Sequence, residues 1–266
     1  MSIKISKKDL KSPDQMTETL RKGFVWTTGH SKVVLAVAGA FIAVGVIYSF
    51  ISYSKEKKEV AQQERYFILE KAYSEKKRSF DEADRAIAVA IQGKDKKAEA
   101  EALKNKPSGD LEKDYSTEVA NFESFIQAAP QTKAAQMAAL NLSEIYMHYK
   151  MNDKALAALE KVEKGLDKKD MLTALVFMQI GNAKADAGDC QSAIMSWQNV
   201  VNNKALAFAH DETKLRMGLC YESMNDLAKA EQVYQEIGNS NAGSTDFTAS
   251  REAQKYLRLL KAKQNL

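Results

Sequence analysis

The segment Ile180–Val200 (IGNAKADAGDCQSAIMSWQNV) constrains the fold of this chain more than any other stretch. Small and apolar residues recur in it at helical spacing on both sides of a Gly-Asp break at Gly188. The pattern predicts two amphipathic helices joined by a tight turn, because glycine adopts the backbone conformations that such turns require. We expect Gly181 to let the second helix approach closely and Trp197 to fill the gap between the two helices. One hairpin buries only one face, so it needs copies stacked beside it.

Two such copies are present in the sequence. One lies 38 residues earlier and places Ser143 and Leu159 at the positions of the glycine and the tryptophan. The other lies 37 residues later and places Gly218 and Tyr234 at those positions. Three hairpins therefore share one register, which predicts a stack of helical pairs.

This order of residues resembles the tetratricopeptide repeat (TPR), whose signature has a large residue, Leu-Gly, Tyr, Ala and a second large residue at these spacings. Tyr146 and Tyr221 stand at the family's tyrosine position, whereas Lys184 departs from it. All three hairpins lack the family's terminal proline, and their turns are longer than those of a repeat of about 34 residues. The resemblance covers about half the chain and implies an α-solenoid that binds proteins.

The composition fits a helical protein. The chain has 266 residues, of which 45% are hydrophobic, with only 3 Pro and 12 Gly. Its apolar positions follow a helical rather than an alternating period, so we expect almost no strand. The predicted fold is all-α, with an N-terminal transmembrane helix, a TPR-like α-solenoid and a C-terminal capping helix. We divide it into a basic tail (1–32), a transmembrane helix (33–53), a charged helical stalk and linker that could include a degenerate repeat (54–114), and the TPR-like repeat domain (115–266).

An apolar run, residues 33–51, contains 19 residues without a charge. As a helix it would be about 28 Å long, enough to cross the hydrocarbon core of a membrane. It is longer than the apolar part of a signal peptide, so we expect an uncleaved anchor, with cleavage near Ser52 as the alternative. Gly39 with Ala43 and Gly45 with Ser49 form small-xxx-small pairs, through which two anchors could pack into a homodimer.

The basic tail bears on orientation in the membrane. It carries a net charge of +4, and Asp14–Trp26 could form an amphipathic helix on the membrane surface or stay disordered. A short basic tail favours a cytoplasmic N-terminus. The Lys and Arg residues within about 20 residues of the run favour the opposite orientation, with the repeats in the cytoplasm, because three precede the run and five follow it.

The arrangement of tail, single span, charged helix and TPR hairpins is similar to that of bacterial inner-membrane proteins known as ancillary subunits of the Sec translocon. This resemblance implies a single-pass protein of the bacterial inner membrane with its repeats in the periplasm. It also implies protein partners among translocon or envelope-assembly components, and contact with lipid through the anchor. A self-associating structural protein that dimerises through its anchor and stalk is the alternative.

Several function classes are disfavoured. The 234 residues after the tail carry 32 basic and 32 acidic side chains, so we expect no nucleic-acid partner. The three histidines lie on different predicted elements without metal or acid–base spacing, so we expect no enzyme activity, metal or cofactor. Gly238–Thr245 approaches a phosphate loop but has Ser244 in place of its lysine, and we interpret it as a plain loop.

The segments around the three hairpins also carry helical patterns. We expect residues 54–78 to extend the membrane helix as a stalk, and 79–91 to form the second helix of a degenerate hairpin. Residues 115–128 place four apolar side chains on one face that can cover the first hairpin: Val119, Phe122, Phe125 and Ile126. We expect residues 247–263 to form the capping helix. Cys190 and Cys220 lie on different helices of neighbouring hairpins, so we expect two buried free thiols, with a disulfide as the alternative.

The candidate site is a groove lined by the first helix of each hairpin, which is where ligands of TPR proteins lie. Carrying that register across gives ten residues: Met137, Leu140, Glu144, Met147, Leu175, Met178, Asn182, Leu215, Leu219 and Glu222. No Lys stands at the positions that clamp a C-terminal carboxylate in some TPR domains. The methionines suit hydrophobic or partly unfolded segments. The alternative is that several of these side chains belong to the core or are covered by the C-terminal helix.

Overall fold

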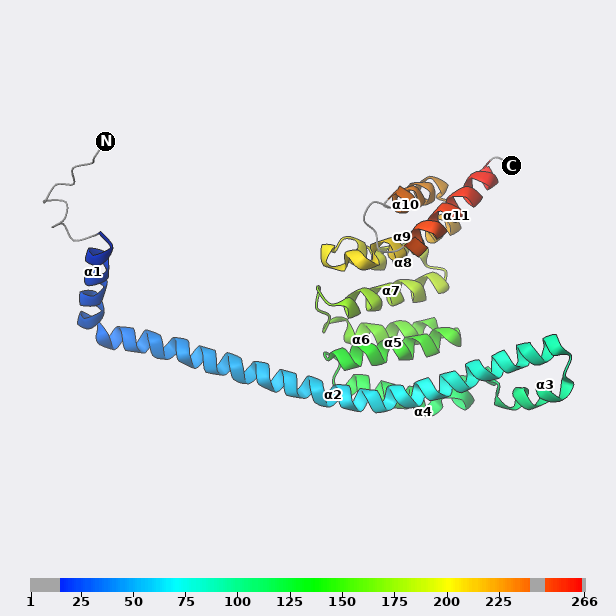
Figure 1. The fold of residues 1–266 in the computed structure, drawn as a ribbon, viewed down its shortest axis with the longest axis horizontal. Coiled ribbons are helices and arrows are strands. Elements are labelled where there is room, and N and C mark those ends of the chain that lie inside the picture. Colours follow the sequence, from blue (N-terminus) through cyan, green and yellow to red (C-terminus); the bar gives the residue numbers. More distant parts are fainter. Residues whose placement is uncertain (1–14, 240–246, 265–266) are drawn as a thin grey trace, which may run out of the picture. The chain divides into compact units, whose positions relative to one another are not determined.

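The computed structural model describes residues 15–239 and 247–264, and every regular element within them is a helix (Figure 1). An all-α fold is therefore confirmed for the described residues. The chain divides into two compact units, Met1–Lys58 and Glu59–Leu266. Helix α2 (Ser31–Gly93) begins in the first unit and ends in the second.

The first unit contains α1 (Gln15–Gly29) and the beginning of α2. Helix α1 covers nearly the same residues as the segment expected to be an amphipathic helix. At its end the rings of Trp26 and His30 stack with their centroids 5.0 Å apart. The helix itself is thus confirmed, and its place on a membrane surface stays a prediction.

By length and composition, α2 is the one helix in the described part of the chain that could cross a membrane. No part of its most apolar stretch is buried. Large apolar side chains such as Phe41 and Phe50 are exposed along it. A core helix of a soluble protein would bury most of this surface.

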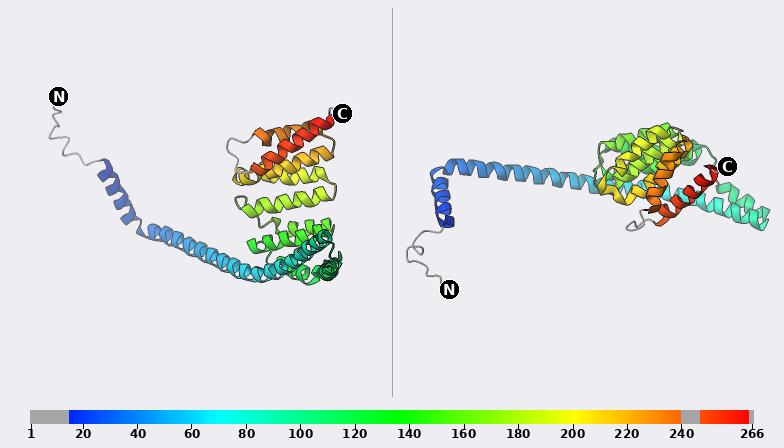
Figure 2. Two further views of the ribbon diagram at one scale, coloured as in Figure 1. Left: turned by 45° about the vertical axis from the view of Figure 1, so that its right-hand side comes forward. Right: turned by 90° about the horizontal axis from the view of Figure 1, so that it is seen from above.

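The second unit is built on three helical hairpins, stacked one on the next (Figure 2). They are α5 (Lys133–His148) with α6 (Asn152–Glu163), α7 (Met171–Asp186) with α8 (Cys190–Val201), and α9 (His210–Ser223) with α10 (Leu227–Asn239). Each hairpin packs on its neighbour through its first helix, as α7 does on α6 and α9 does on α8. The repeating TPR-like architecture is confirmed by this packing.

The turn inside each hairpin has the same geometry. Lys150, Gly188 and Asn225 stand at equivalent places, and all three have a positive φ of 60°, 86° and 61°. The residue after each of them donates its backbone N–H to a carbonyl of the first helix, as Asp189 does to Lys184 at 2.9 Å. Glycine adopts this conformation without strain, which confirms the predicted turn at Gly188. Sequence alone gave no sign that Lys150 would adopt it.

The hairpins close through a small residue on the first helix and a large one on the second. A Cβ atom on Gly181 would lie 2.1 Å from Nε1 of Trp197, and a Cβ on Gly218 would lie 2.4 Å from Cε1 of Tyr234. Both distances are too short for real atoms, so the rings occupy the space that a side chain would need. The predicted glycine–aromatic register is therefore confirmed in both hairpins.

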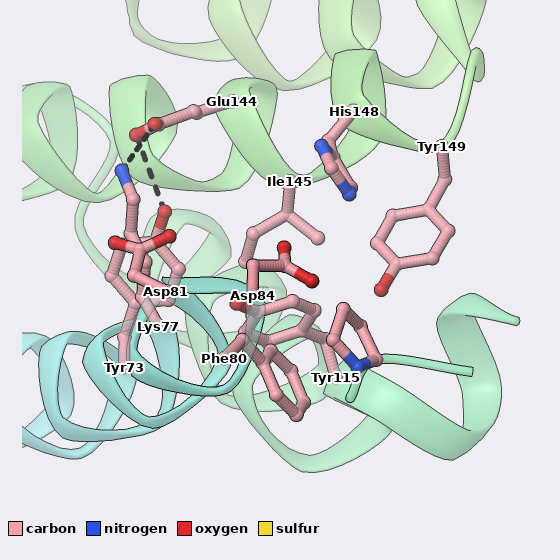
Figure 3. Close-up of a pocket in the computed structure, with 11 residues that line it drawn as sticks. Tyr73, Lys77, Phe80, Asp81, Asp84, Tyr115, Glu144, Ile145, His148 and Tyr149 are labelled. Atoms are coloured by element: carbon pink, nitrogen blue, oxygen red, sulfur yellow. Dashed lines mark hydrogen bonds and ion pairs between the residues drawn. The ribbon is translucent and has the colours of Figure 1, made fainter. Parts of the chain in front are cut away.

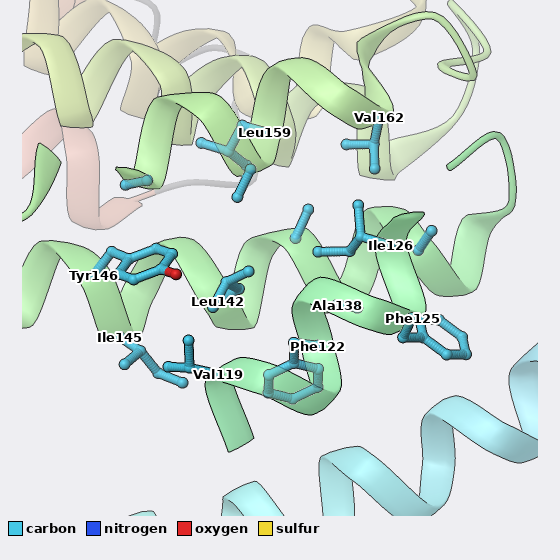
Figure 4. Packing of buried hydrophobic residues seen from close by; sticks show 14 of the residues in the cluster. Val119, Phe122, Phe125, Ile126, Ala138, Leu142, Ile145, Tyr146, Leu159 and Val162 are labelled. Atoms are coloured by element: carbon cyan, nitrogen blue, oxygen red, sulfur yellow. The ribbon is translucent and has the colours of Figure 1, made fainter. Parts of the chain in front are cut away.

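The largest core joins α4 (Leu111–Ala128) to the first hairpin, and Figure 4 shows its packing. Phe122 and Ile126 of α4 are almost fully buried against Leu142 of α5 and Leu159 of α6. The apolar face predicted for residues 115–128 is confirmed, and the helix begins four residues earlier, with a kink at Tyr115.

The second part of α2 continues the apolar helix, as expected, but it is not a free stalk. Tyr73 is buried, with ring centroids 5.9 Å from Tyr115 and 5.8 Å from Phe122. The amide of Asn141 donates to the Tyr66 hydroxyl at 2.9 Å. Residues 59–93 therefore belong to the repeat unit, because their aromatic side chains reach the core of the first hairpin. A separate helix at 79–91 is also wrong, since α2 is continuous through it; α3 (Lys96–Ala102) and the 3-10 turn η1 (Leu103–Asn105) follow.

The other end of the unit is closed by α11 (Phe247–Gln264), as predicted. Ala249, Ala253 and Leu260 are buried against α10 and α9. A short 3-10 segment, η2 (Lys204–Ala209), connects the second and third hairpins. Most of the predicted loop 238–246 lies outside the described residues.

The expectation of two free thiols is wrong. Cys190 and Cys220 form a disulfide, with Cα atoms 5.3 Å apart. Stacking brings the first turn of α8 beside the last turn of α9, so cysteines on different hairpins come within the distance that a disulfide requires. The bond ties the second hairpin to the third.

Candidate functional site

An open hollow of about 410 Å³ lies on the face formed by the first helices of the hairpins. We call it the groove hollow. Met147, Asn182 and Leu219 line it from α5, α7 and α9, and the disulfide and Trp197 also border it. Its volume is within the range of ligand-binding clefts, about 300–1,000 Å³.

The ten predicted groove residues differ in their exposure. Three are exposed: Glu144, Leu175 and Leu219. Six are half-buried: Met137, Leu140, Met147, Met178, Asn182 and Glu222. The structure brings Met147, Asn182 and Leu219 together in the groove hollow, one from each hairpin.

Leu215 was wrongly assigned to the groove, because it is only 3% exposed and lies in the core that α9 shares with α10 and α11. The alternative interpretation, in which the C-terminal helix covers part of this face, is correct at Leu215. Glu222 is also engaged, since it accepts hydrogen bonds from Tyr234 at 3.0 Å and Lys263 at 3.3 Å. The end of the groove at α9 is therefore partly occupied by the chain itself.

The opposite end of the groove is occupied by α2. Glu144 accepts a hydrogen bond from the Tyr73 hydroxyl at 3.2 Å and pairs with Lys77 at 2.5 Å. Leu140 packs against the core that α2, α4 and α5 share. Within the described part of the chain, the uncovered part of the groove is thus its centre, around α7.

A line of polar contacts crosses this centre from one first helix to the next. Gln179 donates to Sδ of Met147 at 3.2 Å, and Asn182 donates to Oε1 of Gln179 at 3.1 Å. Arg216 donates from Nη1 to Asn182 Oδ1 at 3.2 Å and from Nη2 to Glu212 at 2.7 Å. These contacts fix the side chains that a partner would meet.

Sequence reasoning missed Gln179 and Arg216, which directly precede the Ile-Gly and Met-Gly pairs of their hairpins. Asn141 has the same place in the first hairpin. A polar residue at the same position in all three hairpins, two residues before the small residue that faces the second helix, was the signal that could have found them. Nε of Arg216 is buried and, among the described residues, has no hydrogen-bond partner.

The aromatic residue beside the hollow is held by a hydrogen bond as well as by packing. Trp197 donates from Nε1 to the carbonyl oxygen of Met178 at 3.1 Å. Its counterpart Tyr234 donates to Glu222. The pKa of the Tyr234 hydroxyl is raised, mainly by burial and secondly by that hydrogen bond. Both rings are therefore fixed, and that of Trp197 gives the groove hollow a rigid wall, whereas Tyr234 is buried in the core of the third hairpin.

No protein-family model matches the chain, and no curated protein matches it. Among solved structures, it is similar to two crystal structures of MamA, with sequence identities of 22% and 21% and a TM-score of 0.39 for each. The similarity covers 60% and 59% of this chain, and 95% and 88% of the MamA chains. Because both TM-scores are below 0.5, the TPR-like fold rests on the packing of the hairpins themselves.

Proposed function

We propose that this chain is a membrane-anchored scaffold that binds protein partners through the centre of its TPR-like groove. The observation that carries the proposal is the groove hollow, where three hairpins present Met147, Asn182 and Leu219 around a fixed ring. Stacked helical repeats form extended surfaces of this kind, which suit extended segments of other proteins.

The face of the first helices in and around the groove hollow supports an apolar or partly unfolded segment as the ligand. Leu175 and Leu219 are 39% and 38% exposed, which leaves apolar area free on α7 and α9. Methionine adapts its shape to different apolar partners, so Met147 and Met178 suit a surface that accepts several sequences. The polar line through Asn182 and Arg216 adds hydrogen-bonding groups beside that surface.

The anchor in this proposal is residues 33–53. Support comes from the exposed apolar surface of α2, which has the length and hydropathy of a membrane span. Insertion would remove that surface from water, at roughly 25 cal/mol for each Å² of apolar area.

The compartment in this proposal is the periplasm, with the N-terminus in the cytoplasm. The Cys190–Cys220 bond supports it, because disulfides persist in oxidising compartments and are rare in the cytoplasm. A role in secretion or envelope assembly, with translocon or assembly components as partners, rests on the resemblance in architecture alone. Protease access to the repeats in intact spheroplasts tests the orientation: digestion supports it, and protection until lysis contradicts it.

Site-specific photo-crosslinking in membranes tests the groove. A crosslinking residue at Leu219 should give adducts with other proteins. The same residue at Met195, which is exposed on α8 and lies outside the hollow, is the matched control and should give few. Equal adducts from both positions would mean that the groove is not the binding surface.

Self-association is the second candidate function. Phe67 and Ile68 of α2 are 64% and 67% exposed, and a Cβ atom on Gly39 would have no neighbour within 4 Å. A second copy could cover these surfaces, through the exposed face of α2 or through the anchor. Crosslinking from Phe67 that gives homodimers, without heterologous adducts from Leu219, would favour this function over the scaffold.

A further inference from the structure

A second cavity lies away from the groove hollow, between α2, α4 and the end of α5 (Figure 3). We call it the aromatic cavity. Phe80 and Tyr115 line it together with three carboxylates, those of Asp81, Asp84 and Glu144.

The size of the aromatic cavity limits what it can hold. Its volume is about 130 Å³. Clefts that bind cofactors or other small molecules hold about 300–1,000 Å³, whereas a water molecule takes up about 30 Å³. The cavity therefore has room for the end of one side chain and not for a cofactor.

The charge of the cavity is negative. Lys77 neutralises Glu144, but within the described part of the chain Asp81 and Asp84 have no hydrogen bond or ion pair. In Figure 3 the carboxylate of Asp84 points into the space beside Ile145. Helix α5 also ends here at His148, and the C-terminal end of a helix carries partial negative charge. A cation is the ligand that these groups favour.

The walls of the cavity are aromatic. The rings of Phe80 and Tyr115 pack edge to face with centroids 5.5 Å apart, and Tyr149 packs on Tyr115 at 6.2 Å. Aromatic faces attract cations, and the attraction is stronger where water is excluded. Nearby carboxylates increase the negative potential at these rings. The pKa of Tyr115 is raised to about 12, mainly by burial and secondly by the charge of Asp81.

The chain already makes this kind of contact at the same rings. Nζ of Lys76 lies 5.6 Å from the centroid of Tyr115 and pairs with Glu118 at 3.2 Å. Nζ of Lys77 lies 6.0 Å from the centroid of Tyr73 while it pairs with Glu144. In both cases an ammonium group sits between an aromatic face and a carboxylate, but among the residues that the structure describes no cation does so for Asp81 or Asp84.

We propose that the aromatic cavity binds the guanidinium group of an arginine side chain from a protein partner. A guanidinium is planar, stacks on aromatic rings and pairs with carboxylates through two parallel hydrogen bonds. It is also less strongly hydrated than an ammonium group, so it loses less on entering a partly enclosed space. Helix α5 contributes to both sites, with Met147 in the groove hollow and Glu144 and His148 in the aromatic cavity, but no residue lines both. This inference therefore does not depend on the proposed function.

The test uses the full-length chain in detergent micelles and blocked arginine amide as the probe. Binding is measured by ligand-observed NMR, with blocked citrulline amide as the neutral probe of the same shape. The first variant changes Asp81→Asn and Asp84→Asn; both side chains are exposed and unpaired, so the fold should be unaffected. The matched control changes Asp153→Asn and Glu160→Gln, two exposed residues of α6, and alters the net charge equally.

Wild type and control should bind blocked arginine alike, and the Asp81/Asp84 variant should bind at least about fivefold more weakly, which corresponds to about 1 kcal/mol. Blocked citrulline should bind all three proteins weakly and equally. Equal binding of blocked arginine to wild type and the Asp81/Asp84 variant would overturn the proposal. So would displacement of the arginine by millimolar Mg²⁺, because the cavity would then be a site for inorganic cations.

Discussion

Gly181 and Trp197 occupy one shared space, since a Cβ atom on the glycine would lie 2.1 Å from the indole Nε1. The same small–large pairing recurs at Gly218 and Tyr234. In the first hairpin the pair is Ser143 and Leu159, where a slightly larger residue faces a smaller partner. The hairpin therefore requires a certain combined volume of the two side chains, and not a particular residue at either position.

Changing Gly181→Leu should destabilise the protein by about 1–3 kcal/mol through overpacking. The thermal unfolding midpoint measures this. Gly238→Ala is the control, because its Cβ would meet Cγ of Gln254 at an ordinary 3.5 Å. If both variants melt like the wild type, the packing described for the second hairpin is incorrect.

Placing the serine and leucine of the first hairpin at positions 181 and 197 tests whether the two side chains compete for one space. Gly181→Ser alone should be destabilising, because the added atoms meet the indole ring. In a double-mutant cycle with Trp197→Leu, the double variant should lose less unfolding free energy than the two single variants lose together. The favourable coupling should be about 0.5–3 kcal/mol. Additive effects would show that the two side chains do not compete for space.

The sequence predicted the hairpins well because their signals are local. The glycine, the turn and the large residue lie within one hairpin, and the repeats show the same order three times. The packing of α2 could not be predicted in this way. Tyr73 reaches Glu144 across 71 residues of sequence, and its charged neighbours made the segment look solvated.

Contacts between hairpins were equally hard to predict. The cysteine pair depends on how α8 and α9 stack, and the burial of Leu215 depends on where α11 lies. Neither relationship leaves a periodic trace in the sequence. The repeat register therefore predicted correctly that Met147, Asn182 and Leu219 lie in the groove. It did not predict that the chain itself occupies both ends of the groove.

The disulfide should add to stability. Cys190→Ser with Cys220→Ser should lower the unfolding free energy by about 2–4 kcal/mol, because the bond closes a loop with a sequence separation of 30 residues. Denaturant titration with and without reductant measures this. Reductant should shift the midpoint of the wild type and leave that of the double variant unchanged. No shift in the wild type would mean that the thiols are not bonded.

Tyr73→Ala should destabilise the second unit by about 3–5 kcal/mol, as truncation of large buried aromatic side chains does. Tyr73 is 5% exposed, whereas Phe67 on the same helix is 64% exposed. Phe67→Ala is therefore the matched control and should change stability by less than about 0.5 kcal/mol. Equal melting of the two variants would restore the interpretation of α2 as a free stalk.

Asp114 should make the fold sensitive to acid. Burial would raise the pKa of its carboxyl, but hydrogen bonds from Ser108, Tyr149 and Gly109 outweigh burial and lower it. Because the pKa is lower in the folded state, ionised Asp114 stabilises the fold above about pH 4, and this contribution is lost as the pH falls through the folded-state pKa. Asp114→Asn should cost about 1–3 kcal/mol at neutral pH.

The difference in unfolding free energy between wild type and Asp114→Asn should shrink as the pH is lowered towards about 3. Denaturant titrations at both pH values measure it. Asp153→Asn, at an exposed position, is the control and should show no such change. A constant difference at both pH values would mean that folding does not lower the pKa of Asp114.

The most direct test of the groove is to change Met147→Glu and Leu219→Glu together and to measure the capture of partners from native membranes. Neither side chain is fully buried, so the thermal midpoint should be nearly unchanged. The control changes Met195→Glu and Phe208→Glu, each 54% exposed and outside the groove hollow. Capture should fall tenfold or more in the groove variant alone, since two lost apolar contacts are worth roughly 1.5–3 kcal/mol each. A stable groove variant that captures every wild-type partner would contradict the proposed function.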